Sequence, residues 1–204
     1  MRIALYAPRR SGKTTVAQHL VDRFGFTRIA MADPLKDSAV DMINYWLRHQ
    51  GHPRQITREE LDANKPAFRP LLEWLGTPFG RDYLGTPDRW IDSFREYLPD
   101  EGNVVVDDMR QPNEADALRD LGFVIIRVDR PEETRRADLE AAGEPVGPMP
   151  SERALDAIDP DYVLVNDSGL STLYGRTATL MFEIACRSLG RSLVEAARRM
   201  VLSK

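Results

Sequence analysis

The chain has 204 residues, a length that suits one domain with a smaller insertion and is sufficient for a hydrophobic core. Hydrophobic residues make up 42% and charged residues 29%, and the net charge of −4 argues against a non-specific nucleic-acid binder, which needs a basic surface. The single cysteine, Cys186, excludes an intramolecular disulfide framework and a multi-cysteine zinc site.

Strand and helix patterns alternate at the start of the chain. Residues 2–6 form a short apolar run that predicts a buried strand. A helical apolar pattern follows at 13–24, and Gly25 stands where a C-terminal cap belongs. Residues 26–30 predict a second strand. From 34 to 98 the pattern is helical without a strand signal, which indicates a helical insertion after that strand.

The remainder of the chain returns to the alternating pattern. Short β-rich runs alternating with helices predict an α/β fold, in which a parallel sheet is flanked by helices. The further predicted strands are 103–107, 123–129 and 161–167, and the further helices are 113–121, 131–142 and 170–202, with Gly175 and Gly190 as candidate breaks in the last. The predicted single domain has its core at 1–33, 99–130 and 151–204, its helical insertion at about 34–98 and a lid at about 131–150.

A phosphate-binding loop is predicted between the first strand and the first helix. The stretch "YAPRRSGKTT" almost matches G-x-x-x-x-G-K-[ST], with Ala7 at the first glycine position, which costs little if that residue keeps a negative φ. Backbone N–H groups can surround an anion there, Lys13 can reach the β- and γ-phosphates, and the Thr14 hydroxyl suits Mg²⁺. The alternative is a basic turn before an amphipathic helix. The predicted ATP-binding residues of the loop are Arg10, Ser11, Gly12, Lys13, Thr14 and Thr15.

Acidic residues follow the third predicted strand. A P-loop enzyme needs a carboxylate at such a strand end for the Mg²⁺ shell, and "VVVDD" supplies Asp107 and Asp108. Asn113, after a proline, is the expected N-cap of the next helix, which leaves the two aspartates without a capping role. Arg110 is expected at the carboxyl edge of the sheet, where ligands bind in open α/β folds.

Arginines also recur in the segment expected to form a lid. Arg130, Arg135 and Arg136 could meet the charge that develops during phosphoryl transfer. The alternative is a solvated helix face, on which Glu132 pairs with Arg136 at i, i+4.

Six motifs together carry a resemblance to a known family. The chain resembles the deoxynucleoside monophosphate kinases of tailed bacteriophages, and the similarity spans roughly residues 5 to 170. It implies a P-loop kinase that moves the γ-phosphoryl group of ATP onto a deoxynucleoside monophosphate (dNMP) with Mg²⁺, in the cytoplasm of a cell or of a phage host. The motifs are "RRSGKTT", "DPLK", "FRPLLEWLGTPFG", "PDRWID", "DDMRQPNEADALRDLGFVIIRVDRP" and "VLVNDSG".

The resemblance also implies roles for single residues. Lys13 is the triphosphate lysine, and Asn166 and Asp167 lie on the loop that cradles adenine. Thr14 and Asp108 are the implied metal residues, although some relatives carry Asp directly after the lysine. Taken with the lid arginines, and with Trp74 as a residue that could stack on the acceptor base, these roles give two expected sets. The acceptor side comprises Lys36, Arg69, Trp74, Arg89, Asp108 and Arg110, and the catalytic set is Lys13, Arg110, Arg130, Arg135 and Arg136.

Two other functions stay open at this point. A phosphomevalonate-kinase-like activity shares a similar loop, a "PLK" and the strand-end Asp-x-Arg. A nucleotide-dependent switch is less favoured. A switch needs no second anion site, so the arginine-rich insertion would be unexplained. We expect small-molecule substrates, with neither nucleic-acid nor membrane partners. The long C-terminal helix either completes the core or builds a homodimer.

Overall fold

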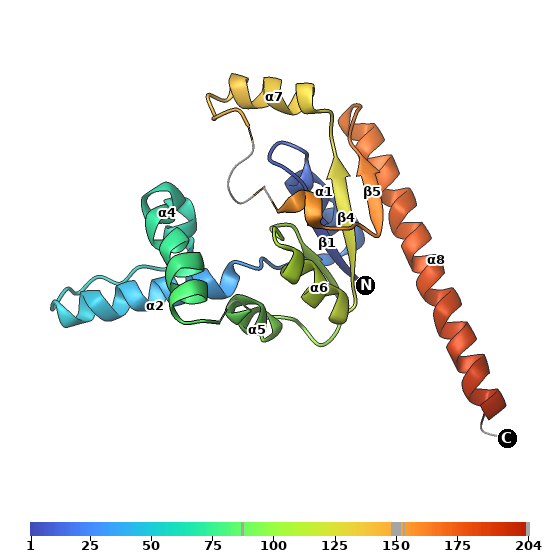
Figure 1. Ribbon diagram of the computed structural model, residues 1–204, viewed down its shortest axis with the longest axis horizontal. Helices are drawn as coiled ribbons and strands as arrows, with labels where there is room; N and C mark the ends of the chain where they lie inside the picture. The colour runs from blue at the N-terminus through green and yellow to red at the C-terminus, as the bar shows by residue number, and fades with distance from the viewer. Residues whose placement is uncertain (87, 148–151, 153, 203–204) are drawn as a thin grey trace. The chain divides into compact units, whose positions relative to one another are not determined.

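The computed structural model describes residues 1–86, 88–147, 152 and 154–202 (Figure 1). The chain forms two compact units. One unit, called the core unit here, comprises Met1–Arg28 and Asn103–Lys204, and the other, the helical unit, comprises Ile29–Gly102. None of the described helices combines the length and the hydropathy that crossing a membrane requires.

The core unit contains a five-stranded sheet in which every neighbouring pair is parallel, in the order β2-β3-β1-β4-β5. β1 is the middle strand, and its Arg2 lies opposite Val104 on one side and Phe123 on the other. This confirms the predicted α/β fold with a parallel sheet. The strands are β1 (Arg2–Tyr6), β2 (Phe26–Arg28), β3 (Asn103–Val106), β4 (Phe123–Asp129) and β5 (Tyr162–Val165).

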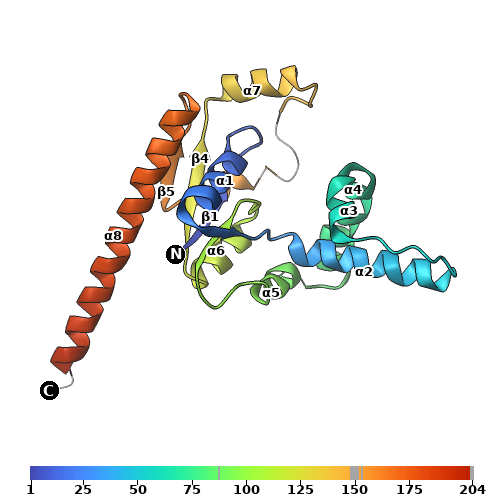
Figure 2. The same ribbon diagram turned by 180° about the vertical axis from the view of Figure 1, so that it is seen from behind.

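Helices cover both faces of the sheet because alternate residues of its strands point to opposite sides. Ile3 and Leu5 of β1 belong to a core cluster with residues of α1 and α8, and α8 runs beside β5 in both views (Figures 1 and 2). On the opposite face the Tyr6 hydroxyl donates to the carbonyl oxygen of Ile158 at 2.7 Å. The helices of this unit are α1 (Lys13–Phe24), α6 (Pro112–Asp120), α7 (Glu132–Ala141), the short 3-10 helix η3 (Leu155–Ala157) and α8 (Leu170–Leu202).

Two details of these helices differ from the sequence predictions. The predicted N-cap Asn113 is wrong, because α6 begins at Pro112 with Gln111 as its cap. Gln111 donates its backbone N–H to Glu114 at 3.1 Å in a capping box, and proline is favoured at the first helical position because it has no N–H to lose there. The candidate breaks in α8 are also wrong, since this helix runs unbroken through Gly175 and Gly190.

The helical unit has its own small hydrophobic core. Ala39, Leu61, Leu72 and Leu75 are buried there together. The π-helix η1 was not predicted, and it depends on Gly80, because a Cβ at that position would overlap the carbonyl oxygen of Leu75. The elements are α2 (Asp33–His49), α3 (Arg58–Ala63), α4 (Lys65–Trp74), η1 (Leu75–Tyr83) and α5 (Arg89–Arg95).

Candidate active site

The predicted phosphate loop connects the central strand β1 to the N-terminus of α1. Gly12 caps that helix with a φ of 95°, a conformation that L side chains rarely adopt. A Cβ on Gly12 would also lie 2.6 Å from the Asn166 side-chain nitrogen. Among the described non-glycine residues only Arg10 has a positive φ, so Ala7 keeps a negative φ at the first glycine position of the pattern. The loop amides and the helix N-terminus together form a site suited to an anion.

Asn166 braces this loop from the far end of the core unit. Its side-chain nitrogen donates to the Ser11 carbonyl oxygen at 2.9 Å, and its backbone N–H donates to the backbone carbonyl oxygen of Asp129 at 2.6 Å. Ser11 is only 1% exposed, and its hydroxyl has no hydrogen-bond partner within the described part of the chain. A buried hydroxyl of this kind is available to a phosphate oxygen.

Lys13 folds back over the loop. Its ammonium group donates to the Ala7 carbonyl oxygen at 2.5 Å. Burial, and then repulsion by Arg110, lower the pKa of Lys13 to about 8, against the opposing attraction of nearby carboxylates such as Glu152. A desolvated ammonium that is held by neutral carbonyl groups gains strongly from a phosphate beside it, which is the role predicted for this lysine.

Two oxygen groups suited to Mg²⁺ lie close together, one at the start of α1 and one just after β3. The Thr14 hydroxyl and an Asp107 carboxylate oxygen are 3.4 Å apart, and Asp107 is buried. Both are hard oxygen donors, the type that Mg²⁺ prefers, so they fit the ion that accompanies a triphosphate. Among the described residues no group of three or more His, Cys, Asp or Glu side chains is arranged to hold a metal ion. The resemblance had favoured Asp108.

Arg28 holds Asp107 from the neighbouring strand β2. Its Nε donates to Oδ1 at 2.9 Å and its Nη2 donates to Oδ2 at 2.7 Å, which is a bidentate pair. The sequence analysis missed this arginine. The signal that could have found it is its position at the end of a strand that neighbours β3 in the sheet.

Further arginines join the loop to the segment around α7. The Arg9 backbone N–H donates to the buried Glu152 carboxylate at 2.7 Å, and the Arg10 side chain pairs with Glu144. Arg130 donates to the Arg10 carbonyl oxygen at 2.8 Å and also pairs with Asp138 at 2.7 Å. Arg130 therefore touches the phosphate loop. Residues 148–150 of the predicted lid lie outside the described residues.

The two arginines within α7 have different surroundings. Arg135 and Arg136 both line a cavity of about 340 Å³ together with Arg9 and Glu152, but they differ in exposure. Arg136 is exposed and pairs with Glu140 at 3.0 Å, rather than with the Glu132 that the sequence suggested. Of these two, Arg135 is the less exposed, being half-buried.

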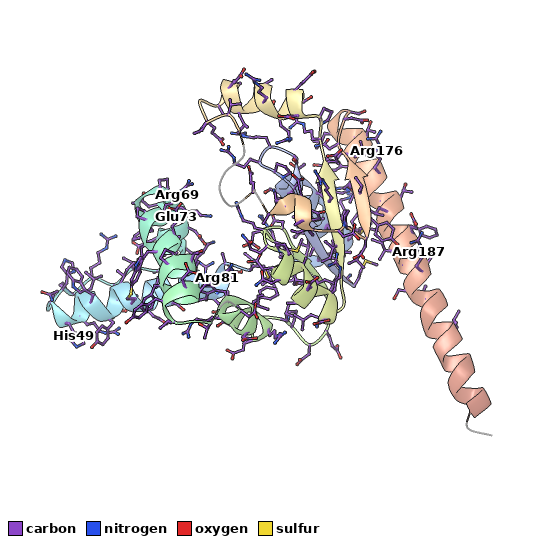
Figure 3. All side chains as sticks on the ribbon, in the orientation of Figure 1. His49, Arg69, Glu73, Arg81, Arg176 and Arg187 are labelled. Atoms are coloured by element: carbon purple, nitrogen blue, oxygen red, sulfur yellow. The ribbon has the colours of Figure 1, made fainter. Side chains whose placement is uncertain are left out.

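The predicted adenine loop follows β5. Asp167 pairs at 2.7 Å with Arg176, which lies on α8. Figure 3 labels Arg176 on that helix. Hydrogen bonds from Arg176 and then Ser168 lower the pKa of the Asp167 carboxyl. Asn166 beside it is occupied by the phosphate loop, as described above. The two residues thus differ, since Asn166 is a brace of the loop and Asp167 is exposed to solvent.

Within the helical unit, Lys36 is part of a charged network. Its ammonium group pairs with Asp62 at 2.7 Å, and the lysine side chain is only 13% exposed. Arg58 also contacts Asp62, at 3.2 Å, and pairs with Asp33 and Asp37 at 2.5 Å each. The network fixes Lys36 at the start of α2.

The other predicted acceptor residues of this unit lie on α4 and α5. Arg69 is exposed on α4 (Figure 3). Trp74 is 46% exposed and stacks on Phe79 with ring centroids 4.6 Å apart. The Arg89 guanidinium lies over the buried Trp90 ring, 5.8 Å from its centroid. Trp90 is therefore a packing residue, whereas Trp74 presents part of its ring to solvent.

No family model matches the chain. A viral protein is similar in sequence: it is 31% identical over 192 residues, which cover 85% of this chain and 92% of that protein. It is described as "Putative deoxynucleotide monophosphate kinase" and comes from Acanthamoeba polyphaga mimivirus. The chain belongs to this family of P-loop kinases.

Solved structures of kinases share the fold. A gluconokinase from Sinorhizobium meliloti 1021 aligns with a TM-score of 0.53 at 16% identity, over 94% of this chain and 97% of its own. The protein TT1252 from Thermus thermophilus aligns with a TM-score of 0.52 at 20% identity, over 90% and 96% of the two chains. At these identities the similarity concerns the fold alone. The protein is a kinase.

Proposed function

We propose that this kinase transfers the γ-phosphoryl group of ATP to a deoxynucleoside monophosphate, giving the diphosphate and ADP. One observation carries the proposal. The loop between β1 and α1 is suited to a triphosphate, because Asn166 braces it and it contains the desolvated Lys13. The viral relative of this chain is described as a deoxynucleotide monophosphate kinase, which supports the nucleotide acceptor.

The donor side is built from the phosphate loop. Lys13 and the loop amides from Arg10 to Thr15 hold the phosphates, and the Ser11 hydroxyl supplies a further donor. Thr14 and Asp107 would hold Mg²⁺, with Asp108 as the neighbouring carboxylate that the resemblance favours. When bound, Mg²⁺ neutralises charge on the β- and γ-phosphates.

The reaction demands positioning rather than a general base. An acceptor monophosphate has a second pKa near 6 by analogy with phosphorylated side chains, so its oxygens are largely ionised at neutral pH. The difficulty lies in holding two polyanions in line, which cationic side chains overcome. We assign Arg110, Arg130 and Arg135 to the transferring group. The proposed acceptor-binding residues are Lys36, Arg69, Trp74, Arg89, Asp108 and Arg110.

The test is an ADP-release assay with ATP and Mg²⁺. The acceptors are dTMP, dGMP, dCMP and dAMP, their ribose counterparts, and phosphomevalonate. We expect turnover on at least one deoxynucleotide, and loss of that turnover in the Lys13→Gln variant, which removes the charge that faces the phosphates. Turnover on phosphomevalonate alone would assign the chain to the second enzymatic interpretation. Nucleotide binding without turnover on any acceptor would favour a switch. A homodimer through α8 stays a prediction, which light scattering tests.

A further inference from the structure

Arg28 and Asp107 form a bidentate ion pair beside the phosphate loop, with both nitrogen–oxygen distances below 3 Å. The two side chains come from adjacent strands, β2 and β3, at the ends nearest the loop. The Asp107 side chain is 5% exposed, whereas that of Arg28 is 40% exposed. The pair therefore joins a buried carboxylate to an arginine that reaches solvent.

The burial of Asp107 gives Arg28 a specific task. A buried carboxylate without a partner of opposite charge is costly, because it has lost its hydration. Arg28 supplies the compensating charge. Because a guanidinium fork meets a carboxylate in one plane, it also fixes the orientation of that carboxylate.

The fixed orientation matters for Thr14. The Asp107 oxygen that accepts from Arg28 Nη2, Oδ2, is the same oxygen that lies 3.4 Å from the Thr14 hydroxyl. A carboxylate oxygen has two lone pairs, so Oδ2 can accept from Arg28 and still present its other lone pair toward Thr14. Rotation of the carboxylate would remove that second interaction.

We propose that Arg28 is a positioning residue of this kinase: it holds the Asp107 carboxylate turned toward Thr14, so that the two oxygens can hold the Mg²⁺ that accompanies the nucleotide. The inference rests on the metal role proposed above for Thr14 and Asp107, and it is independent of the acceptor.

Calorimetry measures this role without phosphoryl transfer. ADP affinity is determined in excess Mg²⁺ and again in EDTA, and the ratio of the two affinities is the metal enhancement. For Arg28→Gln we expect that enhancement to fall by roughly tenfold or more, as for other residues that orient a metal ligand, while affinity in EDTA stays close to that of the wild type. Arg28→Lys should lie between, because it keeps the charge and loses the fork.

Two further variants separate this role from general stability. Arg119 of α6 is a matched control, since its side chain is 33% exposed and pairs with an exposed aspartate, Asp116, at 3.0 Å. Arg119→Gln should keep the metal enhancement. Asp107→Asn should lose it, and adding Arg28→Gln to Asp107→Asn should cause no further loss, because the two residues act as one unit.

Three outcomes would overturn the inference. An unchanged enhancement in both Arg28 variants would make the pair purely structural. A larger enhancement in Arg28→Gln would make Arg28 a competitor of the metal. A wild-type protein without any metal enhancement would remove the proposed metal role together with the inference. If Arg28→Gln does not fold, the metal enhancement of Arg28→Lys is compared with that of Arg119→Gln, and equal values would overturn the inference. Absence of turnover on every dNMP, with a normal metal enhancement, would contradict the acceptor alone.

Discussion

Asn166 donates its side-chain amide to the carbonyl oxygen of Ser11, a residue 155 positions earlier in the chain, at 2.9 Å. The same amide nitrogen is the atom that a Cβ on Gly12 would meet. Asn166, which follows β5, thus braces the phosphate loop and also leaves no room for a side chain at position 12. The loop owes its shape to this contact as well as to its own sequence.

Substitutions of Asn166 should weaken nucleotide binding in a graded way. Asn166→Ala removes one hydrogen bond, worth about 1 kcal/mol, so we expect ADP affinity to fall about fivefold. Asn166→Asp places a carboxylate oxygen against the Ser11 carbonyl and should cost more. Calorimetry with ADP checks both, with Ser168→Ala as the control, because Ser168 contacts Asp167 and leaves the loop untouched. Affinities equal to wild type in both Asn166 variants would show that the contact does not shape the loop.

Gly12→Ala and Gly25→Ala form a matched pair. Both glycines have a positive φ, but a Cβ on Gly25 would meet nothing within 4 Å. The only cost of Gly25→Ala should therefore be the left-handed backbone conformation, which lowers the free energy of unfolding by about 1–2 kcal/mol. The ADP affinity of this variant should be unchanged. Gly12→Ala adds the overlap with Asn166 and should bind ADP at least about tenfold more weakly. Urea unfolding and calorimetry measure the two effects, and equal behaviour of the variants would contradict the explanation.

The lowered pKa of Lys13 predicts a pH dependence of binding. Bound phosphates favour the ionised lysine, so its pKa in the complex lies above the value of about 8 in the free protein. Below pH 8 the lysine is ionised in both states and binding takes up no proton. Above pH 8 the free protein has lost this proton, so binding must recover it and affinity falls as pH rises.

The check is calorimetry at pH 8.5 in buffers of different ionisation enthalpy. The wild type should take up a substantial fraction of a proton per ADP bound. Lys13→Arg, which stays ionised throughout this range, should take up none. Equal proton uptake in the two proteins would assign the titration to another group.

The two arginines of α7 should differ in their effect on turnover. Both arginines line the cavity with Arg9 and Glu152, but Arg135 is half-buried there, and we expect Arg135→Ala to lower kcat about 100-fold if it stabilises the transferring phosphoryl group. Arg136 pairs with Glu140 on an exposed helix face, so Arg136→Ala should have a much smaller effect. Steady-state kinetics decide, and unchanged kcat in both variants would remove the lid from the mechanism.

Much of the core unit could be predicted from the sequence. β1 and β4 match their predicted bounds, because uninterrupted apolar runs between turn residues define a buried parallel strand. The π-helix η1 could not be predicted, since it depends on the close approach of Gly80 to the Leu75 carbonyl. The capping of α6 was assigned to the wrong residue because Asn113 is of a type preferred at an N-cap, whereas Gln111 takes that position by forming a capping box with Glu114.

The site shows a similar division. The phosphate loop is local, so its motif identifies it. The pair of Arg28 and Asp107 arises from the order of strands in the sheet, which places β2 beside β3 although a whole helical unit separates them in the chain. The choice between Asp107 and Asp108 also depends on structure, because adjacent residues leaving a strand point in different directions.

The position of β1 has a consequence for synthesis on the ribosome. This strand is made first, yet its two partners in the sheet begin pairing at Val104 and Phe123. Until those residues leave the ribosome, the apolar residues Ile3 and Leu5 have no strand to join. Such long-range pairing makes folding slow and leaves a hydrophobic strand exposed in the meantime. Nascent chains that stall before Val104 should accordingly bind chaperones or aggregate, whereas chains that extend past Asp129 can complete the centre of the sheet.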